Sequence, residues 1–115
     1  DHLMFCQLSQ YDLHHQIATE VNPTLVFFGA IGCASCRHLK QVLEQVMQRQ
    51  PQWRIFEVDA QQEMGLVREF EVFHLPALFL FSAGEFHAEL HCEARCQAIE
   101  QAVEQALALP AQDAP

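Results

Sequence analysis

Two cysteines separated by two residues, Cys33 and Cys36, are the side chains in this sequence with the clearest capacity for chemistry. Thiols at this spacing can form a reversible disulfide, supply half of a metal site, or fill a core as small apolar groups. The pair lies between an apolar run and a segment with helical periodicity, which predicts a strand, then the cysteines, then a helix. That placement favours a redox pair over the structural and metal-binding alternatives.

A helix that begins at the cysteines would change the chemistry of the first one. The N-terminus of a helix offers unpaired N–H groups and the positive end of its dipole, and both favour a thiolate. Thiol pKa values at such positions fall to roughly 3.5–7.5, and Arg37 adds positive charge nearby. Because Cys36 falls on the apolar stripe of the predicted helix, we expect Cys33 to be the exposed attacking thiol and Cys36 the more buried resolving thiol.

The rest of the chain supplies alternating strands and helices that would hold the pair. Hydrophobic periods, turn residues and helix breakers predict these elements. They are strands over residues 4–8, 24–28, 54–59, 77–82 and 86–90, and helices over residues 11–21, 34–48, 62–70 and 93–107. The order predicts an α/β protein, a three-layer α/β/α sandwich with a mixed central β-sheet. We expect one domain over residues 1–109 and a disordered C-terminal tail over residues 110–115.

Composition narrows the classes of function. The chain has 115 residues, half of them apolar, which is enough for one domain with a hydrophobic core. Its formal charge of −9 argues against nucleic acid as a partner, because phosphate binding requires a basic surface. The longest apolar run, Leu25 to Ile31, is far shorter than a membrane span, so we expect no membrane span in this chain.

The start of the chain bears on its compartment. The sequence begins at Asp1 rather than Met, which indicates processing or trimming. We expect a cytoplasmic protein, or a periplasmic one if a signal peptide or anchor was removed before Asp1. Cysteine usage does not decide between them, because redox motifs occur in both reducing and oxidising compartments.

Three stretches of the sequence resemble the thioredoxin family: TLVFFGAIGCASCRHLKQVL, FEVDA and HLPALFLFSAGE. The match runs in order over nearly the whole chain, from residue 3 to residue 107. The resemblance implies the thioredoxin fold and a thiol–disulfide oxidoreductase in which Cys33 is the nucleophile and Cys36 resolves the mixed disulfide. It implies no cofactor beyond the redox-active disulfide, protein disulfides as substrates, an upstream reductant or oxidant, and a monomer.

The resemblance also implies a substrate-facing surface. Pro76 corresponds to the family's proline with a cis peptide bond beside the disulfide, and it would help present the backbone of Leu75 to a substrate chain. His74 would line the same groove. Cys92 falls where the family has a small residue in a loop bordering the site. It could act as a third thiol that resolves a mixed disulfide, but a small loop residue with no role is the favoured interpretation. The expected substrate-binding set is completed by Gly32, Ala34 and Ser35.

Several positions depart from the family pattern. Gly32 replaces a Trp, and Ala34-Ser35 replaces the usual Gly-Pro between the cysteines. Phe27 stands at the position of a buried Asp, and Ile55 at the position of its partner Lys. Because that acid is thought to help deprotonate the resolving thiol, the second cysteine has no obvious base. His38 would point about 200° away from that cysteine on a helix, so we discount it as the base.

The remaining cysteines and histidines carry weaker signals. Cys96 falls on the buried stripe of the last predicted helix and Cys6 in the first strand, so we expect core positions for both. Cys92 and Cys96 have a spacing that a zinc site could share with the first pair. A second metal candidate is one face of a predicted edge strand, which carries His87, Glu89 and His91. We expect no metal site, because the redox pair faces outward and such a strand face is usually solvated.

The sequence leaves more than one class of function open. The first is a thiol–disulfide oxidoreductase that reduces or exchanges protein disulfides. The second is a non-catalytic thioredoxin-fold module for binding or redox sensing, motivated by the departures at Phe27 and Gly32. The third is a zinc-binding domain with cysteine ligands.

Overall fold

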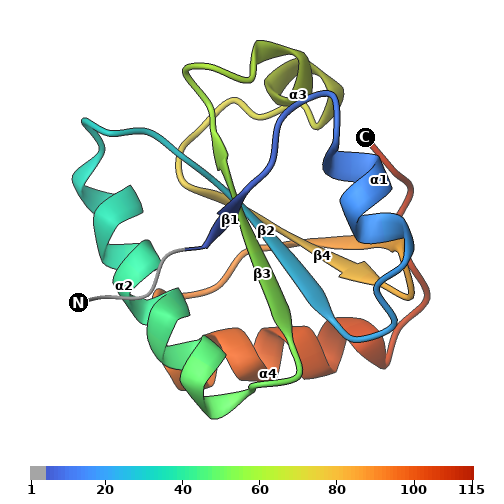
Figure 1. Ribbon diagram of the computed structural model, residues 1–115. Coiled ribbons are helices and arrows are strands. Elements are labelled where there is room, and N and C mark those ends of the chain that lie inside the picture. The colour runs from blue at the N-terminus through green and yellow to red at the C-terminus, as the bar shows by residue number, and fades with distance from the viewer. Residues whose placement is uncertain (1–4) are drawn as a thin grey trace.

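The computed structural model describes residues 5–115, and its elements follow the predicted order (Figure 1). The strands are β1 (Cys6–Gln7), β2 (Thr24–Gly29), β3 (Arg54–Asp59), β4 (Ala77–Ser82) and β5 (Glu85–Leu90). The helices are α1 (Leu13–Ala18), α2 (Ala34–Arg49), α3 (Met64–Glu69) and α4 (Cys96–Leu107). The predicted α/β class is confirmed. Residue 4, expected to begin the first strand, lies outside the described residues.

The strands form one mixed sheet in the order β1-β3-β2-β4-β5. β1, β3 and β2 are parallel to one another, whereas β4 is antiparallel to β2 and β5 is antiparallel to β4. Every residue of the central strand β2 is buried, as its continuous apolar sequence predicts. The C-terminal end of this buried strand leads directly to the segment that carries the two cysteines.

Helices cover both faces of the sheet and give the three layers that were predicted (Figure 1). α2 and α4 pack on one face, where Leu43 of α2 lies in the same core cluster as Ile99 and Val103 of α4. α1 and α3 pack on the other face. α1 contributes two apolar side chains one helical turn apart, and α3 contributes one. These side chains are Leu13, Ile17 and Leu66.

Phenylalanine rings fill the core beneath α1 and α3. Phe70, directly after α3, lies at the centre of the group. Its ring centroid is 5.2 Å from that of Phe79, 5.8 Å from that of Phe28 and 6.0 Å from that of Phe81. Phe86 adds a further ring, 5.7 Å from Phe81. The tilted and edge-to-face arrangements are those that aromatic quadrupoles favour, so α3 is tied to the sheet by ring packing.

A tight turn joins β4 to β5, as predicted for residues 82–85. Ala83 and Gly84 have φ angles of 52° and 84°, the positive values that a type I′ hairpin turn requires. A Cβ atom at Gly84 would also lie 2.6 Å from the carbonyl oxygen of Ala18. Glycine at this position therefore serves both the turn and the close approach of α1.

A β-bulge in this hairpin makes the predicted facing of β5 wrong. The alternating sequence of this strand predicts Phe86, Ala88 and Leu90 on one face. The register shifts instead, because Leu80 pairs with Ala88 whereas Phe81 pairs with Phe86. The extra residue moves the side chains that precede it to the opposite face. Phe86 therefore packs on the α1–α3 side, and Ala88 and Leu90 pack on the α2–α4 side.

The predicted core position of Cys6 is also wrong. Both residues of β1 are exposed, because this strand is the edge of the sheet. The flanking residues Phe5 and Leu8 are buried instead, with 5% and 4% of their surface exposed. The apolar sequence around Cys6 therefore contributes to the core through its neighbours.

The helices differ from prediction mainly at their ends. α1 is shorter than expected, because the Glu20 N–H donates to the Ile17 carbonyl in a tight turn that closes the helix. Val21, which its spacing after Leu13 and Ile17 predicts on the inner face of a longer helix, is consequently 81% exposed. Leu107, also expected inward, is the last residue of α4 and is 38% exposed. Across residues 5–115, no helix has both the length and the apolar character needed to cross a membrane.

A two-pronged ion pair links α2 to α4. Arg49 donates from Nε and Nη2 to the two carboxylate oxygens of Glu100, at 2.8 and 2.9 Å. The hydrogen bond from Arg49 holds the pKa of the Glu100 carboxyl below its ordinary value, although burial acts in the opposite direction. The same hydrogen bond raises the pKa of the Arg49 guanidinium.

The segment expected to be a disordered tail, residues 110–115, forms neither helix nor strand. Gln112 nevertheless makes two hydrogen bonds to β5. Its backbone N–H donates to the His87 carbonyl at 2.7 Å, and its side-chain oxygen accepts from the Glu89 N–H at 3.1 Å. This part of the segment runs beside the β5 edge of the sheet.

The ring cluster should dominate stability on its face of the sheet. Phe79→Ala is expected to lower the free energy of unfolding by about 3–5 kcal/mol, the usual cost of truncating a buried Phe, because Phe79 is 1% exposed. Phe73→Ala is the matched control: Phe73 is 84% exposed, so its loss should change stability by no more than about 0.5 kcal/mol. Urea unfolding measures both, and equal losses would contradict this account of the core.

The Arg49–Glu100 pair should make stability depend on pH. Because the pKa of Glu100 is lowered in the folded protein, its contribution is fully present above its unfolded-state pKa of about 4.3. The contribution is lost as pH falls through the lower folded-state pKa. Glu100→Gln should therefore reduce the unfolding free energy at neutral pH, with a difference from wild type that shrinks under acid conditions. Denaturant unfolding at several pH values measures this difference, and a constant difference would contradict the assignment.

Candidate functional site

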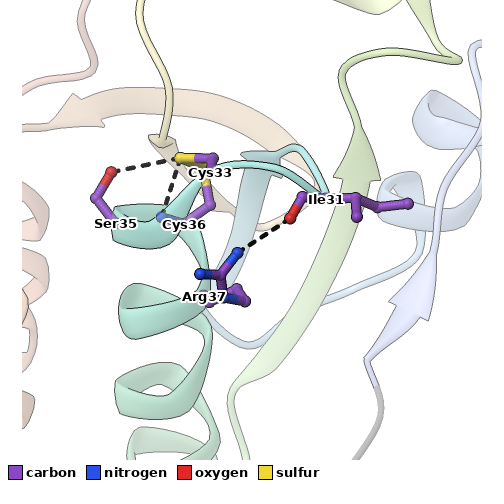
Figure 2. Close-up of a disulfide and its surroundings, with 5 residues drawn as sticks. All are labelled: Ile31, Cys33, Ser35, Cys36 and Arg37. Carbon is purple, nitrogen blue, oxygen red and sulfur yellow. Dashed lines mark hydrogen bonds between the residues drawn. A yellow bond between two sulfur atoms is a disulfide. The ribbon is translucent and has the colours of Figure 1, made fainter.

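Cys33 and Cys36 form a disulfide at the start of α2 (Figure 2). Their Cα atoms are 5.2 Å apart, within the range that a disulfide can bridge. β2 ends at Gly29, and only a short loop separates it from Cys33, the N-cap residue of α2. The pair therefore stands between the buried central strand and the first turn of a long helix, as the sequence predicts.

The Cys33 sulfur occupies the position of the oxygen in an ordinary helix cap. The backbone N–H of Cys36 donates to Cys33 Sγ at 3.1 Å, and the Ser35 hydroxyl oxygen lies 3.3 Å from the same sulfur (Figure 2). In the reduced protein these donors, together with the helix dipole, would favour a thiolate on Cys33. The geometry therefore suits Cys33 to nucleophilic attack.

The two cysteines differ in exposure as predicted. Cys33 is half-buried, whereas Cys36 is 3% exposed and shares a core cluster with Phe27. Gly29 makes this packing possible, because a Cβ atom there would lie 2.8 Å from the Phe27 ring and 3.4 Å from Cys36 Cβ. An incoming disulfide would therefore meet the Cys33 sulfur before that of Cys36.

The residues around the pair form an exposed rim. Ile31 is 79% exposed, and Gly32, Ala34 and Ser35 are exposed as well. Arg37 Nη1 donates to the Ile31 carbonyl at 3.2 Å and so fixes the loop to the first turn of the helix. Figure 2 shows the Arg37 guanidinium directed toward Ile31, with Ser35 on the other side of the sulfur atoms.

The Leu75–Pro76 peptide bond is cis, as the resemblance implied. Pro76 lies directly before β4 and lines two surface hollows. One, of about 230 Å³, is shared with Ser35; the other, of about 510 Å³, is shared with His74. Leu75 and Cys33 pack against the same core cluster. These contacts connect the expected substrate-facing residues to the disulfide end of the molecule.

Cys92 lines the smaller hollow together with Ser35 and Pro76. Burial of its thiol raises the pKa of Cys92, which lowers the thiolate population that an attacking sulfur needs. A role for Cys92 in resolving a mixed disulfide stays a prediction, and this pKa direction counts against it. His38, discounted as the base for Cys36, lies in the same hollow.

The candidate metal ligands are not all gathered at one place, although His91 Nε2 lies 3.7 Å from Glu89 Oε2. The Cys96 thiol lies 3.3 Å from Gln45 Oε1 and 3.7 Å from the Val42 carbonyl oxygen, partly buried against α2 in line with its predicted core position. His87 hydrogen-bonds the Ala106 carbonyl through Nε2 at 2.6 Å. Over residues 5–115, no group of three or more His, Cys, Asp or Glu side chains is arranged to hold a metal ion.

Sequence reasoning missed a charged groove of about 320 Å³ beside Cys36. Lys40 Nζ lies 3.0 Å from Glu57 Oε1 inside it. Two spacings could have revealed this pair: Lys40 follows Cys36 by one helical turn, and Glu57 shares a strand face with Ile55. The residues that line the groove include Phe27, Cys36, Arg37, Lys40, Glu57 and Asp59.

The family model described as Thioredoxin matches residues 4–105. Comparison of the sequence with curated proteins gave no match.

Solved structures share the fold at low sequence identity. Mitochondrial thioredoxin 3 from Saccharomyces cerevisiae, in its oxidized form, superposes with a TM-score of 0.76 at 20% identity, covering 88% of this chain and 94% of that one. Thioredoxin from Trypanosoma brucei brucei gives a TM-score of 0.77 at 17% identity, covering 95% and 96%.

A third similar structure belongs to a much longer chain. Human ERp44 in its zinc-bound form gives a TM-score of 0.75 at 20% identity, covering 89% of this chain. The present chain spans 32% of that protein, so the likeness concerns one part of it.

The two glycines near the pair should respond differently to alanine. Gly29→Ala is expected to destabilise the protein by about 1–3 kcal/mol, since the added methyl group overpacks the contact between Phe27 and Cys36. Gly32→Ala is the control, because its Cβ would meet no atom within 4 Å and its φ is not left-handed. That change should be neutral or stabilise by up to about 1 kcal/mol. Unfolding experiments on the oxidised protein measure both, and a neutral Gly29→Ala would contradict the packing.

Proposed function

The chain belongs to the thioredoxin family, and on that premise we propose that it is a thiol–disulfide oxidoreductase that reduces or exchanges protein disulfides. The observation that carries the proposal is the contact between the Cys36 backbone N–H and Cys33 Sγ, 3.1 Å at the start of α2. This contact supports Cys33 as the nucleophile, because it stabilises a thiolate on the more accessible of the two sulfurs.

The proposed reaction has two steps. The Cys33 thiolate attacks a substrate disulfide, which releases one substrate sulfur as a thiolate and leaves the other bonded to Cys33. Cys36 then attacks the Cys33 sulfur, which releases the second substrate sulfur and closes the Cys33–Cys36 disulfide. A partner dithiol must reduce this disulfide before the next turnover, and a partner that instead keeps the pair oxidised would reverse the net direction.

The substrate surface that we propose joins the exposed rim to the hollows beside Pro76. Ser35 and Pro76 line one hollow together, and His74 extends the surface on the other side of Pro76. Such a surface suits an extended protein segment that carries its disulfide to Cys33. A monomer acting in the cytoplasm, expected from the sequence, stays a prediction.

A non-catalytic module for binding or redox sensing is the second candidate. It is favoured by Phe27 and Ile55, which are 1% and 4% exposed and share the core cluster of Cys36. An apolar floor supplies no acid or base to Cys36. Such a module would form the disulfide but would exchange it slowly with substrates.

Activity with a protein disulfide distinguishes these candidates. Cys33→Ser should reduce the rate of disulfide reduction to the uncatalysed background, because the attacking sulfur is removed. Cys36→Ser should instead trap a mixed disulfide between Cys33 and the substrate, visible as a covalent adduct by mass spectrometry. Cys6→Ser is the matched control, since Cys6 is an exposed free thiol outside the pair, and this variant should keep wild-type activity.

A wild-type protein that reduces protein disulfides no faster than Cys33→Ser would overturn the catalytic proposal and favour the sensing module.

A further inference from the structure

The proposed reaction requires a buried thiol to lose its proton. Cys36 is 3% exposed and rests on Phe27, which is 1% exposed. The strand residues that share its core cluster, Phe27 and Ile55 among them, are apolar, so they offer no proton acceptor. The thiolate of Cys36 is nonetheless needed to break the mixed disulfide. An acceptor must therefore lie at the side of Cys36, where the charged groove opens.

Four charged side chains face this groove from the elements around Cys36. α2 contributes Arg37 and Lys40, and β3 contributes Glu57 and Asp59, whereas the lining residues from β1 and β2 are uncharged. Arg37 is held by the Ile31 carbonyl. The smaller hollow beside Pro76 is lined by His38 and His91 but not by Cys36.

The two carboxylates of the groove are held differently. Asp59 Oδ1 accepts the Gln61 N–H at 2.9 Å and so shapes the loop after β3. Glu57 is held across the groove by Lys40, with 3.0 Å between Oε1 and Nζ. The Glu57 side chain is 16% exposed and that of Lys40 is 31% exposed. Glu57 is therefore a shielded carboxylate held in the groove that Cys36 also lines.

We propose that Glu57 accepts the Cys36 proton through water in this groove, and that Lys40 positions the Glu57 carboxylate for that transfer. The inference rests on the proposed function, whose second step it completes. A polar groove of about 320 Å³ is wide enough to hold water with several polar partners. A base can act through one bridging water as well as by direct contact.

The step balances in protons and electrons. The proton on Cys36 Sγ passes through water to the Glu57 carboxylate. The electron pair left on Cys36 forms the bond to Cys33 Sγ, and the bond between Cys33 and the substrate sulfur breaks. The substrate sulfur leaves as a thiolate and takes a proton from solvent. Glu57 returns its proton to solvent, so the cysteine pair is oxidised by two electrons and the substrate disulfide is reduced by two.

Stopped-flow reaction with a nitrobenzoate disulfide, whose released thiolate is coloured, separates the two steps. The full chain is used with Cys6, Cys92 and Cys96 changed to Ser, so that only the pair reacts. The first phase reports attack by Cys33, and the second reports resolution by Cys36. Both phases are recorded as a function of pH.

Glu57→Gln should leave the first phase unchanged and slow the second by about 10²-fold at neutral pH, the lower end of general-base contributions. The loss should shrink as pH approaches the ordinary thiol pKa of about 8.5, because Cys36 then ionises without help. Glu57→Asp should restore part of the rate. Lys40→Met should slow the second phase less and shift its pH profile.

Asp59→Asn is the matched control, because it removes the same charge from the same groove and the same strand. Its second phase should follow the wild-type pH profile. An unchanged second phase in Glu57→Gln would overturn the inference, and so would an equal effect of Asp59→Asn. If Glu57→Gln fails to fold, wild-type profiles in Glu57→Asp and Lys40→Met would overturn it.

Failure of the proposed function gives a different result. A parent protein without a rapid first phase defeats the oxidoreductase proposal and this inference with it. A rapid first phase followed by a second phase insensitive to Glu57 defeats the inference alone.

Discussion

The chemistry of this protein depends on one contact, the hydrogen bond from the Cys36 backbone N–H to the Cys33 sulfur. It forms because Cys33 has an extended backbone, with φ −100° and ψ 110°, directly before the first turn of α2. The buried strand β2 holds the start of the loop in place. The packing of α2 and α4 in one core cluster holds the start of α2 in place. Sheet and helices together hold a sulfur atom where a helix cap would place an oxygen.

Phe27 and Gly29 together determine the packing around the buried Cys36. Phe27 places an aromatic ring beneath Cys36, and Gly29 provides the space for that ring. An unpaired charge at the position of Phe27 would carry a large desolvation cost. The nearby charges lie instead on Lys40 and Glu57, whose side chains remain partly hydrated. The floor of the site is apolar and its acid–base capacity lies at the side.

Local sequence signals predicted most of the fold and the centre of the site. Continuous apolar runs located β2 and β4, and the helical stripe correctly placed Cys36 inward. Errors arose where tertiary context decides: a bulge reversed the facing of Phe86, and an edge position exposed Cys6. The Lys40–Glu57 pair was missed because its partners come from different elements, so the pair exists only once α2 packs beside β3.

If the start of α2 activates Cys33 as a nucleophile, as we propose, the pKa of the Cys33 thiol in the reduced protein is lowered. The rate of alkylation by iodoacetamide is followed against pH in the reduced protein, with Cys6, Cys92 and Cys96 changed to Ser. This pH profile measures that pKa. The account predicts a value below the ordinary thiol pKa, within roughly 3.5–7.5. A Cys33 pKa at or above about 8.5 would contradict it.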